Sequence, residues 1–229
     1  MLLDERILNF YKHLSTDEVK LPQGVSVMNP YRGKYAKKVG HIMKLFYEKY
    51  YHDNLPRKMI LGINPGRFGA GQTGLMFTDT IRLNENCRIP FHDFSSRELS
   101  SEFFYKVINQ FGGTEKFYGT YYIGAVSPLG YVIQNSRGKE VNYNYYDSSE
   151  LLKSIKPFII KSLHQQLSFN IDRKVCYCLS TGKNYRFLSE LNQELMIFDK
   201  IIPLEHPRYI LQYKRKKSEY YIQKYLEEL

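Results

Sequence analysis

The sequence predicts a single α/β domain in which a mainly parallel sheet is covered by helices on both faces. Short apolar runs typical of buried strands alternate along the chain with longer segments of helical periodicity. No internal repeat, low-complexity segment or linker interrupts the 229 residues, a length that suits one domain. Four such runs predict a three-layer α/β/α arrangement around a central four-stranded sheet.

Six segments have the apolar spacing of amphipathic helices: residues 4–14, 35–51, 95–111, 147–168, 184–195 and 216–229. We expect the third helix to begin with a capping box formed by Ser95 and Glu98 and to stop at Gly112. The fourth begins with Asp147 and contains Pro157, which predicts a break or a kink there.

Four apolar runs are expected to form the strands: residues 58–64, 118–126, 173–180 and 197–204. A Gly-rich loop covers 66–80, and a polar loop rich in Asn and Tyr covers 130–146. Within the one domain, residues 1–55 are expected to add helical cover to a core at 58–213, and the last helix, 216–229, follows the core.

Three of the four predicted strands end in residues with unusual chemistry. These ends are Asn64-Pro65-Gly66, Ser127-Pro128 and His206-Pro207. Ligands of open α/β sheets bind outside the carboxyl ends of the strands. We therefore expect these three segments, although far apart in the sequence, to converge on one site.

The charge balance narrows the class of partner. Lys and Arg number 33 against 23 Asp and Glu, which gives a net charge of +10. Such a surface favours polyanions, namely nucleic acid or an anionic membrane, although solubility alone would also explain it. No apolar stretch approaches 18 residues and the N-terminus lacks the features of a signal peptide. We expect a cytoplasmic, nucleoid-associated protein with no membrane partner.

The three cysteines, Cys87, Cys176 and Cys178, give no sign of a cross-linked or metal-binding protein. An odd number without a signal sequence argues against a disulfide framework. A zinc or iron–sulfur site needs about four ligands in tighter clusters. The expectation is therefore that the protein uses neither a metal nor a cofactor.

The segment 62–77 reads Gly-Ile-Asn-Pro-Gly-Arg-Phe-Gly-Ala-Gly-Gln-Thr-Gly-Leu-Met-Phe. It is neither a Walker loop nor a dinucleotide-binding fingerprint, because no Gly-Lys-Ser/Thr follows and Pro65 interrupts the approach from the strand. It resembles the first motif of the single-strand-selective monofunctional uracil-DNA glycosylases. His206-Pro207 resembles the second motif of their superfamily. The likeness covers about residues 58–213 in element order.

The resemblance implies a four-stranded parallel sheet and hydrolysis of the bond between a damaged base and deoxyribose. Asn64 matches the residue that positions the attacking water, and His206 matches the residue that hydrogen-bonds the oxygen of the departing base. Phe77 matches the side chain that stacks on the flipped base, and the main chain of Ile63 would lie beside the edge of that base.

Two departures from the family pattern affect the expected specificity. Ala125 occupies the position of an Asn that reads the pyrimidine edge. Either Ser127, Asn142 or Asn144 replaces it, or base selection is altered. A roomier pocket would admit a deaminated purine such as xanthine. Secondly, the segment after His206-Pro207 begins Arg208-Tyr209 instead of the family's Ser-Pro-Arg-Asn sequence, so a wedge into the duplex would have to come from these residues.

The residues expected to contact DNA lie in the loops around the strand ends: Gly66, Arg137, Lys183, Arg208 and Tyr209. The basic run 214–217 is a further candidate for phosphate contact.

These observations favour a monofunctional DNA glycosylase of base-excision repair that acts on deaminated bases as a monomer. One alternative from another class stays open: a nucleic-acid-binding module that keeps the fold without catalysis, for which Ala125 is the best support. The mismatch-specific branch of the superfamily is disfavoured because it lacks the histidine. A nucleotide-binding protein that uses the Gly-rich loop is the last alternative.

Overall fold

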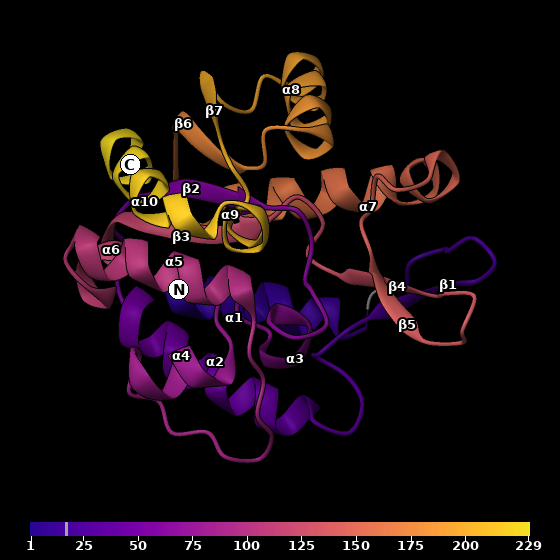
Figure 1. The fold of residues 1–229 in the computed structure, drawn as a ribbon, viewed down its shortest axis with the longest axis horizontal. Helices are drawn as coiled ribbons and strands as arrows, with labels where there is room; N and C mark the ends of the chain where they lie inside the picture. Colours follow the sequence, from indigo (N-terminus) through magenta and orange to yellow (C-terminus); the bar gives the residue numbers. More distant parts are fainter. Residues whose placement is uncertain (17) are drawn as a thin grey trace.

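The central sheet has four parallel strands in the order β3-β2-β6-β7 (Figure 1). Their bounds are Arg57–Gly62 for β2, Tyr121–Ala125 for β3, Ile171–Leu179 for β6 and Lys200–Leu204 for β7. The structure, a computed structural model, describes residues 1–16 and 18–229. The predicted parallel sheet is confirmed. The second predicted strand begins later than expected, because its first residues belong to the short helix α6, Thr114–Thr120.

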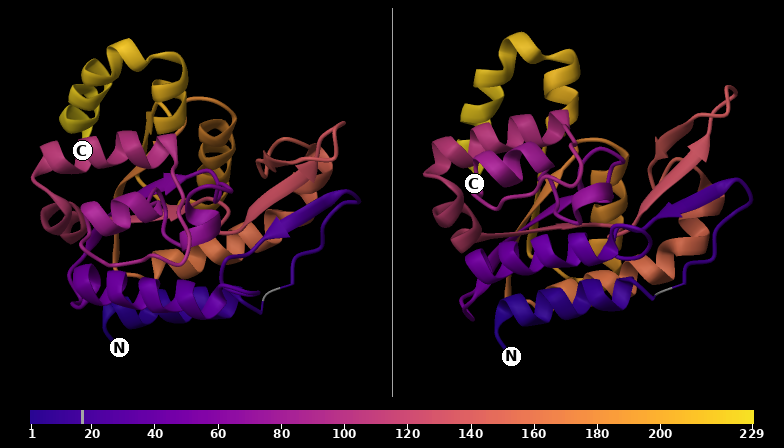
Figure 2. Two further views of the ribbon diagram at one scale, coloured as in Figure 1. Left: turned by 60° about the horizontal axis from the view of Figure 1, so that its bottom comes forward. Right: turned by 90° about the horizontal axis from the view of Figure 1, so that it is seen from below.

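Helices cover both faces of this sheet, as the three-layer prediction requires. Figure 2 shows α1, α2 and α7 on one side and α5, α9 and α10 on the other. Their bounds are Leu3–Leu14, Ala36–Tyr51 and Ser149–Leu167 on the first side, and Leu99–Phe111, Pro207–Tyr213 and Ser218–Glu228 on the second. Helix α8, Lys183–Leu195, connects β6 to β7. The remaining short elements are α3, Ala70–Thr73, α4, Thr80–Glu85, and a 3₁₀ turn, Arg215–Lys217.

Two expected helix starts are wrong. Helix α5 begins at Leu99 with Glu98 as its N-cap residue, and no side chain caps it, so Ser95 and Glu98 form no capping box. Helix α7 is capped by Ser148, whose hydroxyl accepts the N–H of Leu151. Of the break or kink expected at Pro157, the break is wrong, because α7 continues through it. Proline removes the hydrogen bond that its nitrogen cannot donate and crowds the carbonyl four residues before it, a cost that the buried face of this long helix outweighs.

A second sheet, which the sequence analysis missed, projects from the body beside α7 (Figures 1 and 2). Its antiparallel strands are β1, Val25–Met28, β4, Gly130–Gln134, and β5, Glu140–Tyr143, in the order β1-β4-β5. The expectation of an irregular loop over 130–146 is therefore wrong. β1 and β5 have four residues each and are mostly half-buried, so they lack the apolar run that marks a buried strand, and the apolar part of β4 is only three residues long.

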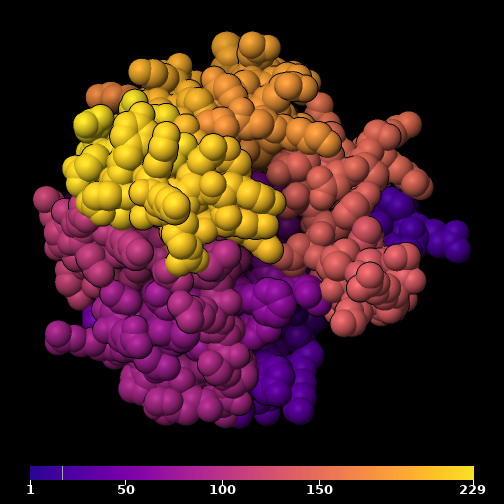
Figure 3. All heavy atoms as spheres, viewed as in Figure 1, coloured from indigo at the N-terminus to yellow at the C-terminus, as the bar shows by residue number. Residues whose placement is uncertain are grey.

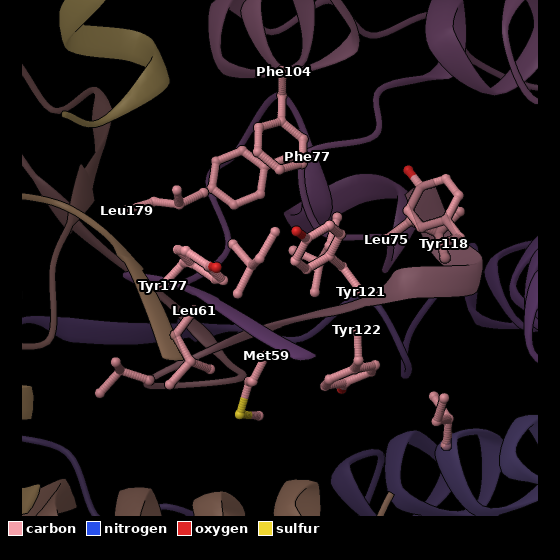
Figure 4. Packing of buried hydrophobic residues seen from close by; sticks show 14 of the residues in the cluster. Met59, Leu61, Leu75, Phe77, Phe104, Tyr118, Tyr121, Tyr122, Tyr177 and Leu179 are labelled. Atoms are coloured by element: carbon pink, nitrogen blue, oxygen red, sulfur yellow. The ribbon is translucent and has the colours of Figure 1, made fainter. Parts of the chain in front are cut away.

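The core contains many aromatic side chains, in line with the 21 tyrosines and 14 phenylalanines of the sequence. Figure 4 shows part of it, with the rings of Phe77 and Phe104 side by side next to Leu179. The largest fully buried side chain is that of Arg57, at the start of β2. All three cysteines are buried. In the described part of the chain, no helix combines the length and apolarity needed to cross a bilayer.

Candidate active site

The carboxyl ends of β2 and β7 open into a cavity of about 540 Å³. Asn64 and His206 both line it, so two of the three expected strand ends meet here, whereas Ser127 and Pro128 are not among the lining residues. Figure 3 shows the molecule hollowed between the yellow C-terminal helices and the salmon-coloured segment that carries β4 and β5. We call this space the active-site cavity.

Asn64 is held with a defined amide orientation. Its Oδ1 accepts the main-chain N–H of Tyr145 at 3.2 Å, and its Nδ2 donates to the carbonyl of Pro65 at 3.3 Å. An amide has a second lone pair on its oxygen and a second hydrogen on its nitrogen. Both contacts therefore leave Asn64 able to bind a further polar group from the cavity.

The Tyr145 main chain that orients Asn64 is itself anchored in the interior. The Tyr145 hydroxyl donates to Oδ1 of Asn184 at 2.6 Å, and Nδ2 of Asn184 donates to Sγ of Cys178 at 3.2 Å. Tyr145 and Asn184 are fully buried. Sequence reasoning missed these positioning residues, because the contacts join segments distant in the chain and no local pattern marks them.

His206 precedes α9 as its N-cap residue, with Pro207 at the first helical position. The Nδ1 atom accepts the N–H of Arg208 at 3.1 Å, which requires Nδ1 to be unprotonated. Burial, reinforced by the positive charge of Arg208, lowers the pKa of His206 to about 4. At neutral pH the imidazole is therefore uncharged and carries its proton on Nε2, where it is available as a donor.

Phe77 has an unusual backbone conformation for a bulky residue, with φ at +53°. Its ring centroid lies 5.0 Å from that of Phe104 and 6.0 Å from that of His206. Glycine at position 62 makes this placement feasible, because a Cβ there would lie 3.0 Å from Cε2 of Phe77. The strained backbone holds an aromatic ring at the wall of the cavity.

The Gly-rich segment forms a tight turn above a buried carboxyl group. The carbonyl of Gly66 accepts the N–H of Gly69 at 3.2 Å and that of Gly71 at 3.0 Å. The carboxyl of Glu98 fills the space beneath, since a Cβ built on Gly66 would lie 2.9 Å from its Oε1. Burial and the neighbouring Asp79 raise the pKa of Glu98 to about 7, against an opposing effect of Arg208. Sequence reasoning took Glu98 for a helix cap and missed this role.

Ile63 lines the cavity, whereas Ser127 does not. The Ser127 N–H donates to the carbonyl of Ile63 at 3.1 Å, while its hydroxyl bonds the hydroxyl of Tyr131 and the carbonyl of Leu129. Ala125 is also buried, and its carbonyl accepts from Gln166. Ser127 was one candidate replacement for the missing Asn. Its hydroxyl already has hydrogen-bond partners within the protein, so it does not serve as that replacement.

Asn142 lies on β5 and Asn144 directly follows it, and both line the cavity. Oδ1 of Asn142 accepts the N–H of Arg67 at 3.0 Å, which joins the second sheet to the Gly-rich turn. The Asn142 amino group lies next to Gly66, because a Cβ there would be 3.7 Å from Nδ2. These two amides are the polar groups that the second sheet adds to the site.

The five residues predicted to contact DNA divide into two sets. Gly66, Arg208 and Tyr209 line the cavity. Arg137 lies in the exposed turn between β4 and β5, and Lys183 is exposed at the start of α8; neither lines the cavity. Among the lining residues that sequence reasoning did not assign are two cationic or polar and two aromatic side chains: Arg67, Gln212, Phe68 and Tyr213. Arg67 and Phe68 lie within the motif at 62–77. A charged residue next to an aromatic one in a loop after a strand is the signal that could have identified them.

The cavity combines an oriented amide, a neutral imidazole, an aromatic wall and a basic rim. Over residues 1–16 and 18–229, no group of three or more His, Cys, Asp or Glu side chains is arranged to hold a metal ion. The carboxyl of Glu98 lies at the Gly-rich turn within the cavity lining.

Comparison with known proteins places this chain in a family. The profile of the uracil DNA glycosylase superfamily matches residues 48–229. A search of curated proteins found none that matches. The crystal structure of wild-type SMUG2 from Pedobacter heparinus has 45% sequence identity and a TM-score of 0.95, over 99% of this chain and 96% of that one. The resemblance to the single-strand-selective monofunctional branch is thus confirmed, and the chain belongs to the uracil-DNA glycosylase superfamily.

Proposed function

We propose that this DNA glycosylase is monofunctional and removes deaminated bases, uracil and xanthine, from DNA for base-excision repair, with water as the nucleophile. One observation carries the proposal: Asn64 and the neutral His206, from the ends of β2 and β7, line the same cavity in fixed orientations. In this proposal the protein acts as a monomer on chromosomal DNA in the nucleoid.

His206 would stabilise the departing base. As the bond between C1′ and the base nitrogen breaks, its electron pair leaves with the base, and negative charge grows on the base oxygens. The Nε2–H of a neutral imidazole donates to such an oxygen without losing its proton, and its strength rises in a site from which water is excluded. The Nδ1 bond to Arg208 fixes the tautomer that this step requires.

Asn64 would position the water that attacks C1′. The sugar becomes cationic in the transition state, so a neutral amide orients the water without a change in its own charge. The contacts with Tyr145 and Pro65 hold the amide in one rotamer, which is the preorganisation that positioning needs. The water oxygen bonds to C1′, and a water proton is finally taken up by the released base.

The choice of uracil and xanthine follows from the edge that each base offers. Both present a carbonyl, an N–H and a second carbonyl in sequence on a six-membered ring, whereas hypoxanthine lacks the second carbonyl. We expect the amides of Asn142 and Asn144 to read this edge, in place of the family Asn that is Ala125 here. A cavity of about 540 Å³ supports this proposal, because it leaves room for the second ring of a purine.

The test uses end-labelled oligonucleotides that carry one deoxyuridine, deoxyxanthosine or deoxyinosine, incubated with chelator and then treated with alkali. We expect alkali-dependent breaks at uracil and xanthine. His206→Ala and Asn64→Ala should each lower the single-turnover rate by about 10²- to 10³-fold, because each removes a contact made to the transition state. The exposed His164→Ala on α7 is the matched control and should act like wild type.

Breaks without alkali would contradict a monofunctional mechanism. Unchanged rates in His206→Ala and Asn64→Ala would remove both residues from the chemistry. Activity on deoxyinosine equal to that on deoxyxanthosine would contradict the argument from the shared carbonyl edge.

A further inference from the structure

A second cavity of about 490 Å³ adjoins the active-site cavity across the Gly-rich turn. Gly66, Arg67, Phe68 and Ala70 line the active-site cavity, and the next two residues, Gly71 and Gln72, line the second one. Its other wall is the loop that leads into α2, which passes beside α3 (Figure 1). We call this second space the flanking cavity.

Exposed aromatic rings gather at these two cavities. Within the described residues, five Phe and Tyr side chains are classed as exposed: Tyr35, Phe68, Tyr209, Tyr213 and Tyr220. All but Tyr220 line one of the two cavities. Exposure of large aromatic rings to water is unfavourable. Their concentration at two adjoining cavities therefore indicates a surface that is covered when a ligand binds.

Tyr35 is the ring that the flanking cavity offers. It stands just before the first residue of α2 and is 40% exposed. The ring of Phe94 packs against it at 5.2 Å and 60°. This contact supports Tyr35 from the protein side and leaves part of the ring open to a planar partner.

Positive charge accompanies the exposed rings. Lys34 Nζ lies 5.3 Å from the centroid of Tyr35, and the guanidinium of Arg67 lies 4.9 Å from that of Phe68. The Nε of Arg67 is buried without a hydrogen-bond partner in the described part of the chain. Among residues 1–16 and 18–229, those that line the flanking cavity include two cations, Arg32 and Lys34, and no carboxylate.

We propose that the flanking cavity binds a neighbouring nucleotide of the target strand, with its unpaired base stacked on Tyr35 and its phosphate paired with Lys34 and Arg32. The proposal rests on DNA being the substrate of the active-site cavity. Alternating aromatic faces and cations are what single-stranded nucleic acid requires, because every base has a stacking face and every nucleotide a phosphate. The flanking cavity would therefore favour a target whose neighbouring bases are unpaired.

The experiment compares single-stranded oligonucleotides that carry one deoxyuridine and are extended stepwise on the 5′ or the 3′ side. Binding is measured by fluorescence anisotropy in the Asn64→Ala background, and base release is measured with Asn64 intact. We expect affinity to rise with extension on one side only. Lys34→Ala/Tyr35→Ala should abolish this gain, a loss of about tenfold, since stacking of one base on an aromatic ring is typically worth that much or more.

Controls separate this proposal from the proposed function and from misfolding. Lys153→Ala/Tyr220→Ala removes an exposed lysine and an exposed tyrosine that line neither cavity, and it should retain the gain. Tyr35→Phe keeps the ring and should also retain it. On the shortest substrate, Lys34→Ala/Tyr35→Ala should release base at the wild-type rate, which shows that the fold and the chemistry are intact.

Two results would overturn the proposal. The first is a Lys34→Ala/Tyr35→Ala variant whose gain with length equals that of wild type. The second is an equal loss when a complementary strand pairs the flanking bases, because paired bases cannot stack on Tyr35. Absence of base release from every oligonucleotide by wild type would instead count against the proposed function, while the anisotropy series would still test the flanking cavity.

Discussion

The two ends of strand β2 are built in opposite ways. At the amino end, the fully buried guanidinium of Arg57 donates to the carbonyls of Tyr118 at 2.8 Å and Leu55 at 2.9 Å, and pairs with Asp53 at 2.7 Å. At the carboxyl end, Asn64 has two weaker contacts and faces a cavity.

The contrast shows how one sheet separates stability from function. Polar groups at the amino end are satisfied within the protein, so they hold the fold and have no capacity left for a ligand. At the carboxyl end, oriented groups keep unused bonding capacity, and Phe77 adopts a strained backbone. Substitutions at the first end should therefore lower the free energy of unfolding, whereas those at the second should lower activity or, where they neutralise a desolvated acid, raise the free energy of unfolding.

The largest effect is expected at the amino end. Arg57→Met removes the cation from a buried network and leaves its carbonyl partners without a donor. The free energy of unfolding should fall by about 3 to 5 kcal/mol, measured by urea denaturation, because each buried carbonyl left without a donor costs about 1 to 3 kcal/mol. The half-exposed carboxylate of Asp53 can be solvated and adds little. The rate of base release per folded molecule should stay within about twofold of wild type, because no contact of the active-site cavity is altered.

The control for this substitution is Lys44→Met on α2. Lys44 forms an exposed pair with Glu48 one turn later, and such pairs contribute about 0.3 to 0.5 kcal/mol. A loss of stability in Arg57→Met no greater than in Lys44→Met would refute the view that the amino end of β2 is a stabilising network.

The next effect concerns Glu98, a buried acid at the functional end. Its pKa is raised from 4.5 to about 7, so ionisation costs more in the folded than in the unfolded chain. Its contribution to stability is complete below pH 4.5 and is lost as the pH rises to 7. Glu98→Gln mimics the protonated acid and should be more stable than wild type by at most about 3 kcal/mol at pH 8, with no difference near pH 4.5. Urea midpoints at the two pH values measure this.

His206 acts in the opposite direction, because its pKa is lowered from 6.5 to about 4. Its contribution is present above pH 6.5 and is lost as the pH falls to 4. Both the wild type and Glu98→Gln contain His206, so the difference between them isolates Glu98. Glu115→Gln, at an exposed glutamate, serves as the control. An equal gain in stability in Glu115→Gln would show that the raised pKa of Glu98 is not the cause of the gain in Glu98→Gln.

The smallest effect is expected at Gly62, the last residue of β2. Gly62→Ala places a Cβ 3.0 Å from Cε2 and 3.1 Å from Cζ of Phe77, so the ring must shift. We expect the single-turnover rate to fall by about tenfold, since a small misplacement at a preorganised site is costly. Gly119→Ala on α6, where a Cβ meets nothing within 4 Å, is the control. Equal rates in the two variants would show that the position of Phe77 does not limit catalysis.

The parts of the molecule that were predictable are those with a local cause. The strands β2 and β3, and the last four residues of β6, appear as apolar runs because they are buried on both faces, and the half-buried β7 still has an apolar run. The amphipathic helices appear as periodic patterns for the same reason. Asn64 and His206 were identifiable because each follows a strand, and the carboxyl ends of parallel strands meet at one edge.

The parts that could not be predicted depend on contacts between distant segments. Strand β5 is half-exposed and is defined by its pairing with β4 rather than by its own composition. The sequence around Glu98 fits a capping pattern. In the structure, however, the Glu98 N–H donates a hydrogen bond to Asp79, and the Glu98 carboxyl lies under the Gly-rich turn. The rotamer of Asn64 depends on Tyr145, 81 positions along the chain.

Residue order thus determines which elements form and which chemistry stands at their ends, because burial and turn geometry act over a few neighbouring residues. It does not determine the orientation of Asn64, the tautomer of His206 or the ionisation of Glu98. Those properties arise from desolvation and from hydrogen bonds that exist only after the sheet, the helices and the second sheet have packed together.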